Sequence, residues 1–318
     1  MKHMQNAIHP PLDESGIILR EKLNLRWMRY MLFPAVILIA AILTFHGYIA
    51  WALARPTIAP LTSNPLEAVG LAYEDVHFPS SDGTGRLEGW YIPSEGSHRS
   101  VVFSHGYGGN REELWVPFYS LAEELHKRSY NVLLFDYSYV RPEISATGGI
   151  RESRELQGAI EYVRTRGGTS NYVWGFSMGA GTALQTALYS QDITGMVLDS
   201  TFILEPDTMF MNVRQQINLP NISNPLIRLF FPFLNGTSIR KIPYEAVKST
   251  SYSVPILFIH GMKDAKAPYD MVESIYANQS ENPNSNLWLV PNGRHELIYK
   301  ANKREYLKRS FEFLKRAE

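Results

Sequence analysis

A serine between glycines is the first feature of this sequence that could do chemistry. Gly-Phe-Ser-Met-Gly at 175–179 follows an apolar run at 172–174 and opens an apolar helical pattern from Ala180. In a strand–turn–helix arrangement, these glycines permit a tight turn that lifts the serine hydroxyl above the edge of a sheet. The pattern alone is weak, but the strand before it and the helix after it make Ser177 a candidate nucleophile.

The other groups that such a serine needs stand in three further turns. His-Gly-Tyr-Gly-Gly-Asn at 105–110 follows an apolar run, and a glycine-rich turn there would expose a backbone N–H to an oxyanion. The N–H of Met178, at the entry of the helix, supplies a second donor. Asp264 lies just beyond the His-Gly that ends one apolar run, and His295 follows another. A serine, an acid and a histidine therefore follow one another along the chain.

From residue 73 onward, short apolar runs alternate with amphipathic helical patterns. Leu156, Ile160 and Val163, for example, repeat at helical spacing. This alternation predicts a mostly parallel sheet with helices on both faces. No helical pattern separates the first two runs, so we expect them to form an antiparallel edge. The eight predicted strands span residues 74–78, 87–92, 101–104, 131–136, 172–176, 196–199, 256–260 and 287–290.

One stretch, residues 202–253, separates two predicted strands by far more than a typical connection. Its aromatic clusters are too apolar for a solvated loop. Structurally, it is expected to be a small helical insertion that packs on the sheet. Functionally, it is expected to be a lid over the serine, with Phe210, Phe230 and Phe231 along an acyl pocket.

An uncharged, mostly apolar run lies between Arg29 and Arg55. At about 1.5 Å per helical residue, it is long enough to cross the roughly 30 Å hydrocarbon core of a bilayer. More basic residues precede this run than follow it, which predicts that the bulk of the chain faces away from the cytoplasm. Two alternatives are a buried core helix and a cleaved signal peptide, because Ala-Leu-Ala at 52–54 has the pattern of a cleavage site.

The expected organisation has four parts. The prolines after the apolar run indicate a tether without regular structure. The parts are a cytoplasmic segment at 1–29, a transmembrane anchor at 30–54, the tether at 55–72 and a folded domain at 73–318.

Residues 73–316 resemble an alpha/beta-hydrolase. Within that superfamily the chain is most similar to membrane-anchored serine hydrolases labelled peptidases or lysophospholipases. These share an N-terminal anchor, a His-Gly-x-x-Gly-Asn turn and a His-Gly-x-x-Asp turn. The resemblance implies the alpha/beta-hydrolase fold, without a cofactor or metal. It also implies the site residues: Ser177 as nucleophile, His295 as base, Asp264 as the acid that orients it, and Tyr107 and Met178 as oxyanion N–H donors.

Several other polar residues lie near predicted strand ends. Asp199 is an alternative to Asp264, because some relatives take the acid from that earlier strand. His105 is expected to make orienting hydrogen bonds, as is the histidine four residues before Asp264. Asp136 is expected to hold a turn and not a metal, because no second ligand lies at a suitable spacing. Glu296 is expected to be a solvated or capping residue.

The composition excludes several classes of protein. Among the 318 residues, Lys+Arg and Asp+Glu both total 31, so no basic field favours nucleic acid. No cysteine is present, which excludes disulfides, thiolate zinc sites, iron–sulfur clusters and cysteine nucleophiles. The oligomeric state does not follow from these features.

These features together predict a serine hydrolase that cleaves carboxylic (acyl) esters through an acyl-enzyme. The apolar insertion and the membrane anchor favour lipid or medium-chain acyl substrates. A serine peptidase or amidase is the alternative, since the same groups cleave amides. A catalytically silent, membrane-anchored binding module is a third possibility, against which the intact Ser, Asp and His argue.

Overall fold

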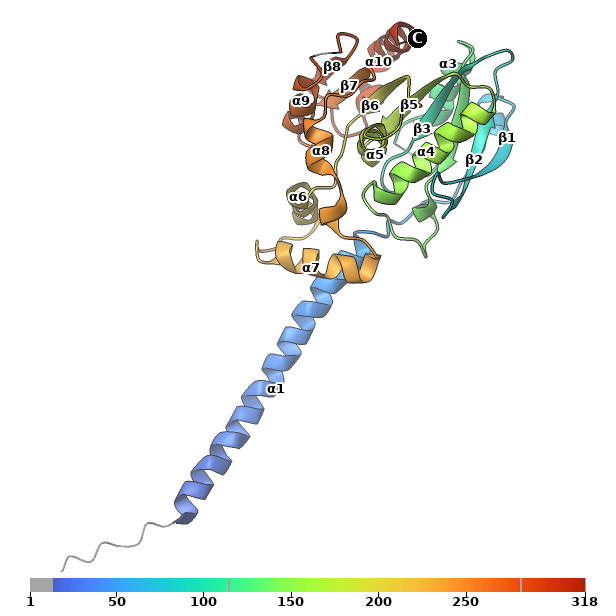
Figure 1. The fold of residues 1–318 in the computed structure, drawn as a ribbon. Helices are drawn as coiled ribbons and strands as arrows, with labels where there is room; N and C mark the ends of the chain where they lie inside the picture. Colours follow the sequence, from blue (N-terminus) through green and yellow to red (C-terminus); the bar gives the residue numbers. More distant parts are fainter. Residues whose placement is uncertain (1–13, 114, 281, 318) are drawn as a thin grey trace, which may run out of the picture.

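One eight-stranded sheet organises the chain (Figure 1). The computed structural model describes residues 14–113, 115–280 and 282–317, with side chains from residue 27 onward. All eight predicted strands are confirmed, with ends that differ by about two residues or fewer. The strands are β1 (Glu74–Pro79), β2 (Arg86–Ile92), β3 (Arg99–Ser104), β4 (Asn131–Asp136), β5 (Ser170–Phe176), β6 (Gly195–Asp199), β7 (Ile256–Gly261) and β8 (Asn286–Val290).

The strands lie in the order β1-β2-β4-β3-β5-β6-β7-β8. Strand β2 runs antiparallel to both of its neighbours, and every pairing from β4 to β8 is parallel. The predicted antiparallel edge is therefore confirmed. Because the strands from β3 to β8 share one direction, their carboxyl ends meet along one edge, where a site can be assembled from several loops.

Helices cover both faces of the sheet, as predicted. On one face, α4 (Ile150–Thr165), α5 (Met178–Ala187) and α9 (Tyr269–Ala277) supply buried apolar side chains to a shared core. On the other face, α3 (Phe118–His126) and α10 (Ile298–Arg316) do the same. Strands β6 and β7 are buried along their whole length and β4 at all but its last residue, which explains why they read as continuous apolar runs.

The long stretch between β6 and β7 is a helical insertion. It contains α6 (Pro206–Gln216), α7 (Ser223–Asn235), the short 3-10 helix Ile239–Lys241 and α8 (Tyr244–Ser249). Side chains of α6 and α7 form a small apolar core that also includes Ile49 and Ala50 from the N-terminal helix and Ala54 just after it. The insertion is therefore packed on that helix as well as on the sheet.

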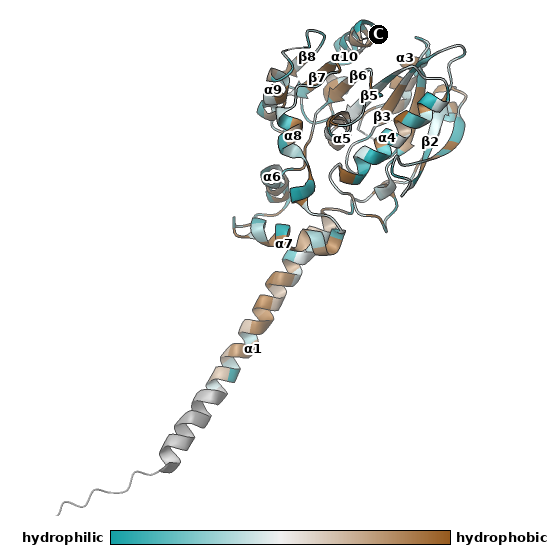
Figure 2. Cartoon of the chain, in the orientation of Figure 1, coloured by the Kyte–Doolittle hydropathy of each residue, from teal (hydrophilic) through white to brown (hydrophobic). Residues whose placement is uncertain are grey.

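The N-terminal helix α1 (Glu14–Ala52) extends away from the domain, and α7 crosses the end of α1 that lies nearest the domain (Figure 1). Within the described residues, Trp27–Ala52 is the one stretch long and apolar enough to cross a membrane. Figure 2 shows this helix as largely apolar over its exposed length. The predicted orientation is not tested by the fold, and Lys2, one of the basic residues behind it, lies outside the described part of the chain.

Polar contacts fasten α1 to α7. His46 Nε2 lies 2.9 Å from Ser223 Oγ, and the Asn235 side-chain amide donates to Ala50 O at 2.8 Å. Arg55 donates to Asn235 Oδ1 at 2.7 Å. The end of the apolar helix therefore belongs to the folded domain.

Residues 55–72, which we expected to be a tether, follow the surface of the domain. They include a short helix, α2 (Pro65–Val69). The Thr62 hydroxyl donates to Glu112 Oε1 at 2.7 Å, and the Asn110 side-chain amide donates to Ala59 O at 2.9 Å. These bonds hold the segment against the turn after β3.

Candidate active site

Ser177 lies at the turn between β5 and α5, where its backbone adopts φ 51° and ψ −117°. This positive φ is uncommon for a residue with a side chain and is held by the packing around it. A Cβ on Gly175 would lie 2.7 Å from Ala180 Cα, and a Cβ on Gly179 would lie 2.0 Å from Ser104 O. Both glycines are therefore required by close approach of backbone, as the sequence motif predicts.

Two short hydrogen bonds connect three of the predicted residues. Ser177 Oγ lies 2.7 Å from His295 Nε2, and His295 Nδ1 lies 2.7 Å from Asp264 Oδ2. The other oxygen of Asp264 accepts from the backbone N–H groups of Lys266 and Ala267, both at 2.9 Å. These contacts orient the carboxylate toward the imidazole, so a proton on Nδ1 leaves Nε2 free to accept one from the serine.

The alternative acid, Asp199, is directed elsewhere. Its Oδ1 accepts from Ser200 Oγ at 2.8 Å, and burial raises its pKa to about 7. His105 and His260 make orienting bonds, as expected. His105 Nε2 accepts from Tyr137 N–H at 3.2 Å, and burial lowers its pKa to about 4; His260 Nε2 lies 2.9 Å from Ala267 O.

Asp136 holds a turn, as expected. Its Oδ1 accepts a hydrogen bond from the backbone N–H of Arg111 at 2.6 Å, and its Oδ2 forms an ion pair with the guanidinium of Arg111 at 3.2 Å. In the part of the chain that the structure describes, no group of three or more His, Asp or Glu side chains is placed so that it could hold a metal ion.

The predicted oxyanion turn wraps around a buried carboxylate. Glu113 Oε1 accepts from the N–H of Trp115 at 3.2 Å, and its Oε2 lies close to Gly109, where a Cβ would approach within 2.2 Å. Tyr107 lies in this turn, and its hydroxyl donates to Leu53 O at 3.1 Å. Met178 is the first residue of α5, where N–H groups have no partner within the helix.

Glu296 is buried beside the serine, contrary to our expectation of a solvated or capping residue. Its backbone N–H donates to Ser200 Oγ at 2.9 Å, and its backbone adopts a φ of 55°. A Cβ on Gly106 would lie 2.5 Å from Glu296 Oε1 and 3.4 Å from Ser177 Cβ. Burial, and then the nearby charge of Glu113, raise the pKa of Glu296 to about 8.

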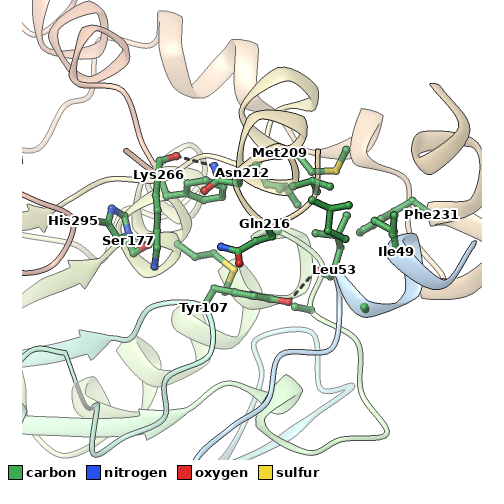
Figure 3. A pocket seen from close by; sticks show the side chains of 18 of the residues that line it. Ile49, Leu53, Tyr107, Ser177, Met209, Asn212, Gln216, Phe231, Lys266 and His295 are labelled. Carbon is green, nitrogen blue, oxygen red and sulfur yellow. Dashed lines mark hydrogen bonds between the residues drawn. The ribbon is translucent and has the colours of Figure 1, made fainter. Parts of the chain in front are cut away.

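A cavity of about 440 Å³ begins at Ser177 and His295 and extends to the end of α1 (Figure 3). Its volume is within the range of small-molecule sites. The turns after β3 and β6, helix α6 and the last turns of α1 all contribute to its walls. Its apolar lining residues include Ile49, Leu53, Phe202, Leu204, Met209, Val213 and Phe231.

The three predicted pocket aromatics take different places. Phe231 lines the cavity, whereas Phe210 and Phe230 are not among its lining residues. Phe210 packs in the small core of the insertion, and Phe230 lies beside Gly47 of α1. Neighbouring positions on a helix point in different directions, so one aromatic cluster divides between a cavity wall and a packing surface.

The cavity wall that the sequence analysis missed comes from α1. Tyr48, Ile49, Ala52 and Leu53 were assigned to a membrane anchor, which gave no reason to place them near Ser177. The alanines at the end of that run offered the one available signal, because small residues allow helices to approach closely.

The insertion is also bonded to the loop that carries the acid. On α6, the Asn212 side chain donates to Lys266 O at 2.8 Å, and the Gln215 side chain donates to Ala265 O at 2.5 Å. A shift of α6 would therefore disturb the loop that orients His295.

The raised pKa of Glu296 predicts a pH-dependent stability. Between the ordinary value of 4.5 and about 8, the folded chain retains a proton that the unfolded chain releases, so this group lowers stability as pH rises through that window. Replacing it by glutamine (Glu296→Gln) removes this loss. The melting temperature of the variant relative to the original protein should therefore increase from pH 5 to pH 8.

The exposed Glu95 supplies the matched control, Glu95→Gln. The melting temperatures of both variants and of the original protein would be measured across that pH range. If the melting-temperature difference of Glu296→Gln changed with pH no more than that of Glu95→Gln, the assignment would be contradicted.

Comparison with known proteins supports the fold. A family model described as "alpha/beta hydrolase fold" matches residues 99–222, a range that includes Ser177 but ends before Asp264 and His295. The uncharacterised protein YfhR of Escherichia coli K12 is 28% identical over 232 residues, which cover 70% of this chain and 73% of that protein.

Two further similar proteins are named for an activity. The lysophosphatidylserine lipase ABHD12 of Danio rerio is 26% identical over 67% of this chain and 58% of its own length. The structure of the esterase Pf2001 from Pyrococcus furiosus superposes with a TM-score of 0.65 and 26% identity, over 82% of this chain and 98% of that one. Its eight-stranded, mostly parallel sheet, its serine turn and these similarities show that the chain has the alpha/beta-hydrolase fold.

Proposed function

We propose that this chain is a membrane-anchored serine hydrolase that cleaves carboxylic esters of lipid or medium-chain acyl groups. The observation that carries the proposal is the pair of 2.7 Å hydrogen bonds from Ser177 through His295 to Asp264. These residues lie at one end of a largely apolar cavity, which favours substrates with an acyl chain. The esterase and lipase among the relatives support the same reaction.

The proposed reaction proceeds in two halves. Ser177 Oγ attacks the ester carbonyl while its proton moves to His295 Nε2, and Asp264 stabilises the resulting imidazolium. The N–H groups of Tyr107 and Met178 are the proposed donors to the oxyanion. His295 returns the proton to the departing alcohol as the ester C–O bond breaks, which leaves an acyl group on Oγ. Water, activated by the same imidazole, then releases the acid and restores the serine.

Helix α1 is proposed as an uncleaved membrane anchor. Ala54, which ends the possible cleavage pattern, is buried, and its carbonyl accepts from Ala146 N–H at 2.7 Å. A packing role accounts for the small residues there. The basic residues Arg20, Lys22, Arg26 and Arg29 precede the apolar stretch, which supports a domain on the extracytoplasmic side.

The nucleophile is tested by replacing Ser177 with alanine. The Ser177→Ala variant cannot form an acyl-enzyme, so covalent labelling by a fluorophosphonate should disappear and ester turnover should fall by about 10⁴-fold or more. The exposed Ser249 on α8 gives the control, Ser249→Ala, which should label normally. Normal labelling of Ser177→Ala would refute the assignment.

The acid is tested by comparing Asp264→Asn with Asp199→Asn. An asparagine at 264 favours the wrong histidine tautomer, so kcat should fall by about 10⁴-fold while the fold persists. The same change at 199, whose carboxyl contacts Ser200, should leave kcat within about tenfold. Steady-state kinetics and melting temperatures of both variants check this, and the reverse ranking would make Asp199 the acid.

The acyl cavity is tested by filling it from α6. Val213 lines the cavity, so Val213→Phe should shorten the acyl chain that is hydrolysed best, because each excluded methylene forfeits about 0.8 kcal/mol. Met211 lies on the same helix but not among the lining residues, and Met211→Phe is the control. Rates would be measured for esters of increasing chain length and for aminoacyl amides. An unchanged chain-length profile in Val213→Phe would remove the cavity from substrate selection.

A further inference from the structure

Helix α7 carries large apolar side chains on its exposed side. Ile222, just before the helix, is 69% exposed; Leu229 and Phe233 on the helix are 55% and 79% exposed. Leu229 lies 7 residues after Ile222, and Phe233 lies 4 residues after Leu229, a helical spacing that places the three side chains on one face. The opposite face packs through Ile227 and Phe231 against α1 and α6. Exposed apolar side chains gathered on one helix face mark an interaction surface.

The position of α7 on α1 places this surface at a membrane boundary. Helix α7 meets α1 near Ile49, and twenty residues separate Ile49 from Arg29, the last basic residue before the apolar stretch. At 1.5 Å per residue, that interval is about 30 Å, the thickness of the hydrocarbon core. If Arg29 lies at one headgroup layer, α7 therefore lies at the other, crossing α1 at its end (Figure 1).

The cavity reaches the surface at the same level. Tyr48, on α1, lines the cavity and is 63% exposed, and its ring stacks on Trp51 at 6.0 Å. Trp115, Tyr107 and Ile217 are also both exposed and part of the lining. Aromatic side chains of this kind prefer the headgroup region.

We propose that α7 lies in the bilayer interface beside the anchor helix, and that the acyl chain of the substrate enters the cavity from the bilayer, past Tyr48. The proposal rests on the serine-hydrolase function and the anchor proposed above. The occupant of the exposed α7 face is the lipid bilayer, because α1 continues directly from the membrane into the cavity wall. An acyl chain that leaves the bilayer along this route remains in apolar surroundings until its ester reaches Ser177.

The interfacial position of α7 is tested without any catalysis. The chain has no cysteine, so single cysteines at Phe233 and at Leu66 can each carry an environment-sensitive NBD fluorophore. Leu66 lies on α2, which packs against α3, and is 56% exposed. In the full-length protein reconstituted into phosphatidylcholine vesicles, lipids with a quencher on the acyl chain should quench the label at 233 about threefold more than the label at 66. Equal quenching at the two positions would overturn the proposal, as would contact of another protein with α7 in place of lipid.

The entry route is tested by a charge on the α7 face. Phe233→Glu should lower hydrolysis of a long-chain ester presented in vesicles about tenfold relative to hydrolysis of a short, water-soluble ester. Leu66→Glu should change that ratio less than about twofold. An unchanged ratio in Phe233→Glu would refute entry from the bilayer while leaving the hydrolase intact. If the protein hydrolysed none of the esters but the label at 233 were still quenched, the proposed function would be refuted, whereas the position of α7 in the interface would stand.

Discussion

The strained turn at Ser177 is the constraint on which the geometry of the site depends. A serine at φ 51° is held there because β5, α5 and the end of β3 pack against one another at backbone contact. A side chain at Gly179 would collide with Ser104 O, so the elements could not approach closely enough to hold the turn. Strain of this kind costs about 1–3 kcal/mol and persists only where the surrounding structure over-determines it. The central sheet supplies that rigidity.

The partners of the serine reach it through loops at the same edge of the sheet. Asp264 follows β7 and is fixed by two backbone N–H groups, while His295 follows β8. The helical insertion is bonded to the Asp264 loop through Gln215 and Asn212. Helix α6 and the imidazole of His295 are thus connected through the Asp264 loop, and a movement of α6 would displace that loop.

Helix α1 combines two roles that are usually separate. The stretch Trp27–Ala52 is apolar and mostly exposed, yet one side of its last turns, with Ile49 and Ala50, is buried against the insertion, and these turns form a wall of the cavity. Tyr107, in the turn after β3, bonds to Leu53 O at the end of this helix. A domain cut off at residue 55 would lack that wall, so the end of the apolar helix is a structural part of the cavity.

Local pattern in the sequence was enough to locate all eight strands and the glycines around Ser177, because periodicity and close backbone approach restrict residue types directly. It also marked 202–253 as a helical insertion. The sequence could not say which aromatic of that insertion faces the cavity, since Phe230 and Phe231 differ only in direction around one helix. Nor could it show that Glu296 is buried beside Glu113, or that α1 lines the cavity. Those facts depend on contacts between segments far apart in the chain, and only the packed tertiary structure decides them.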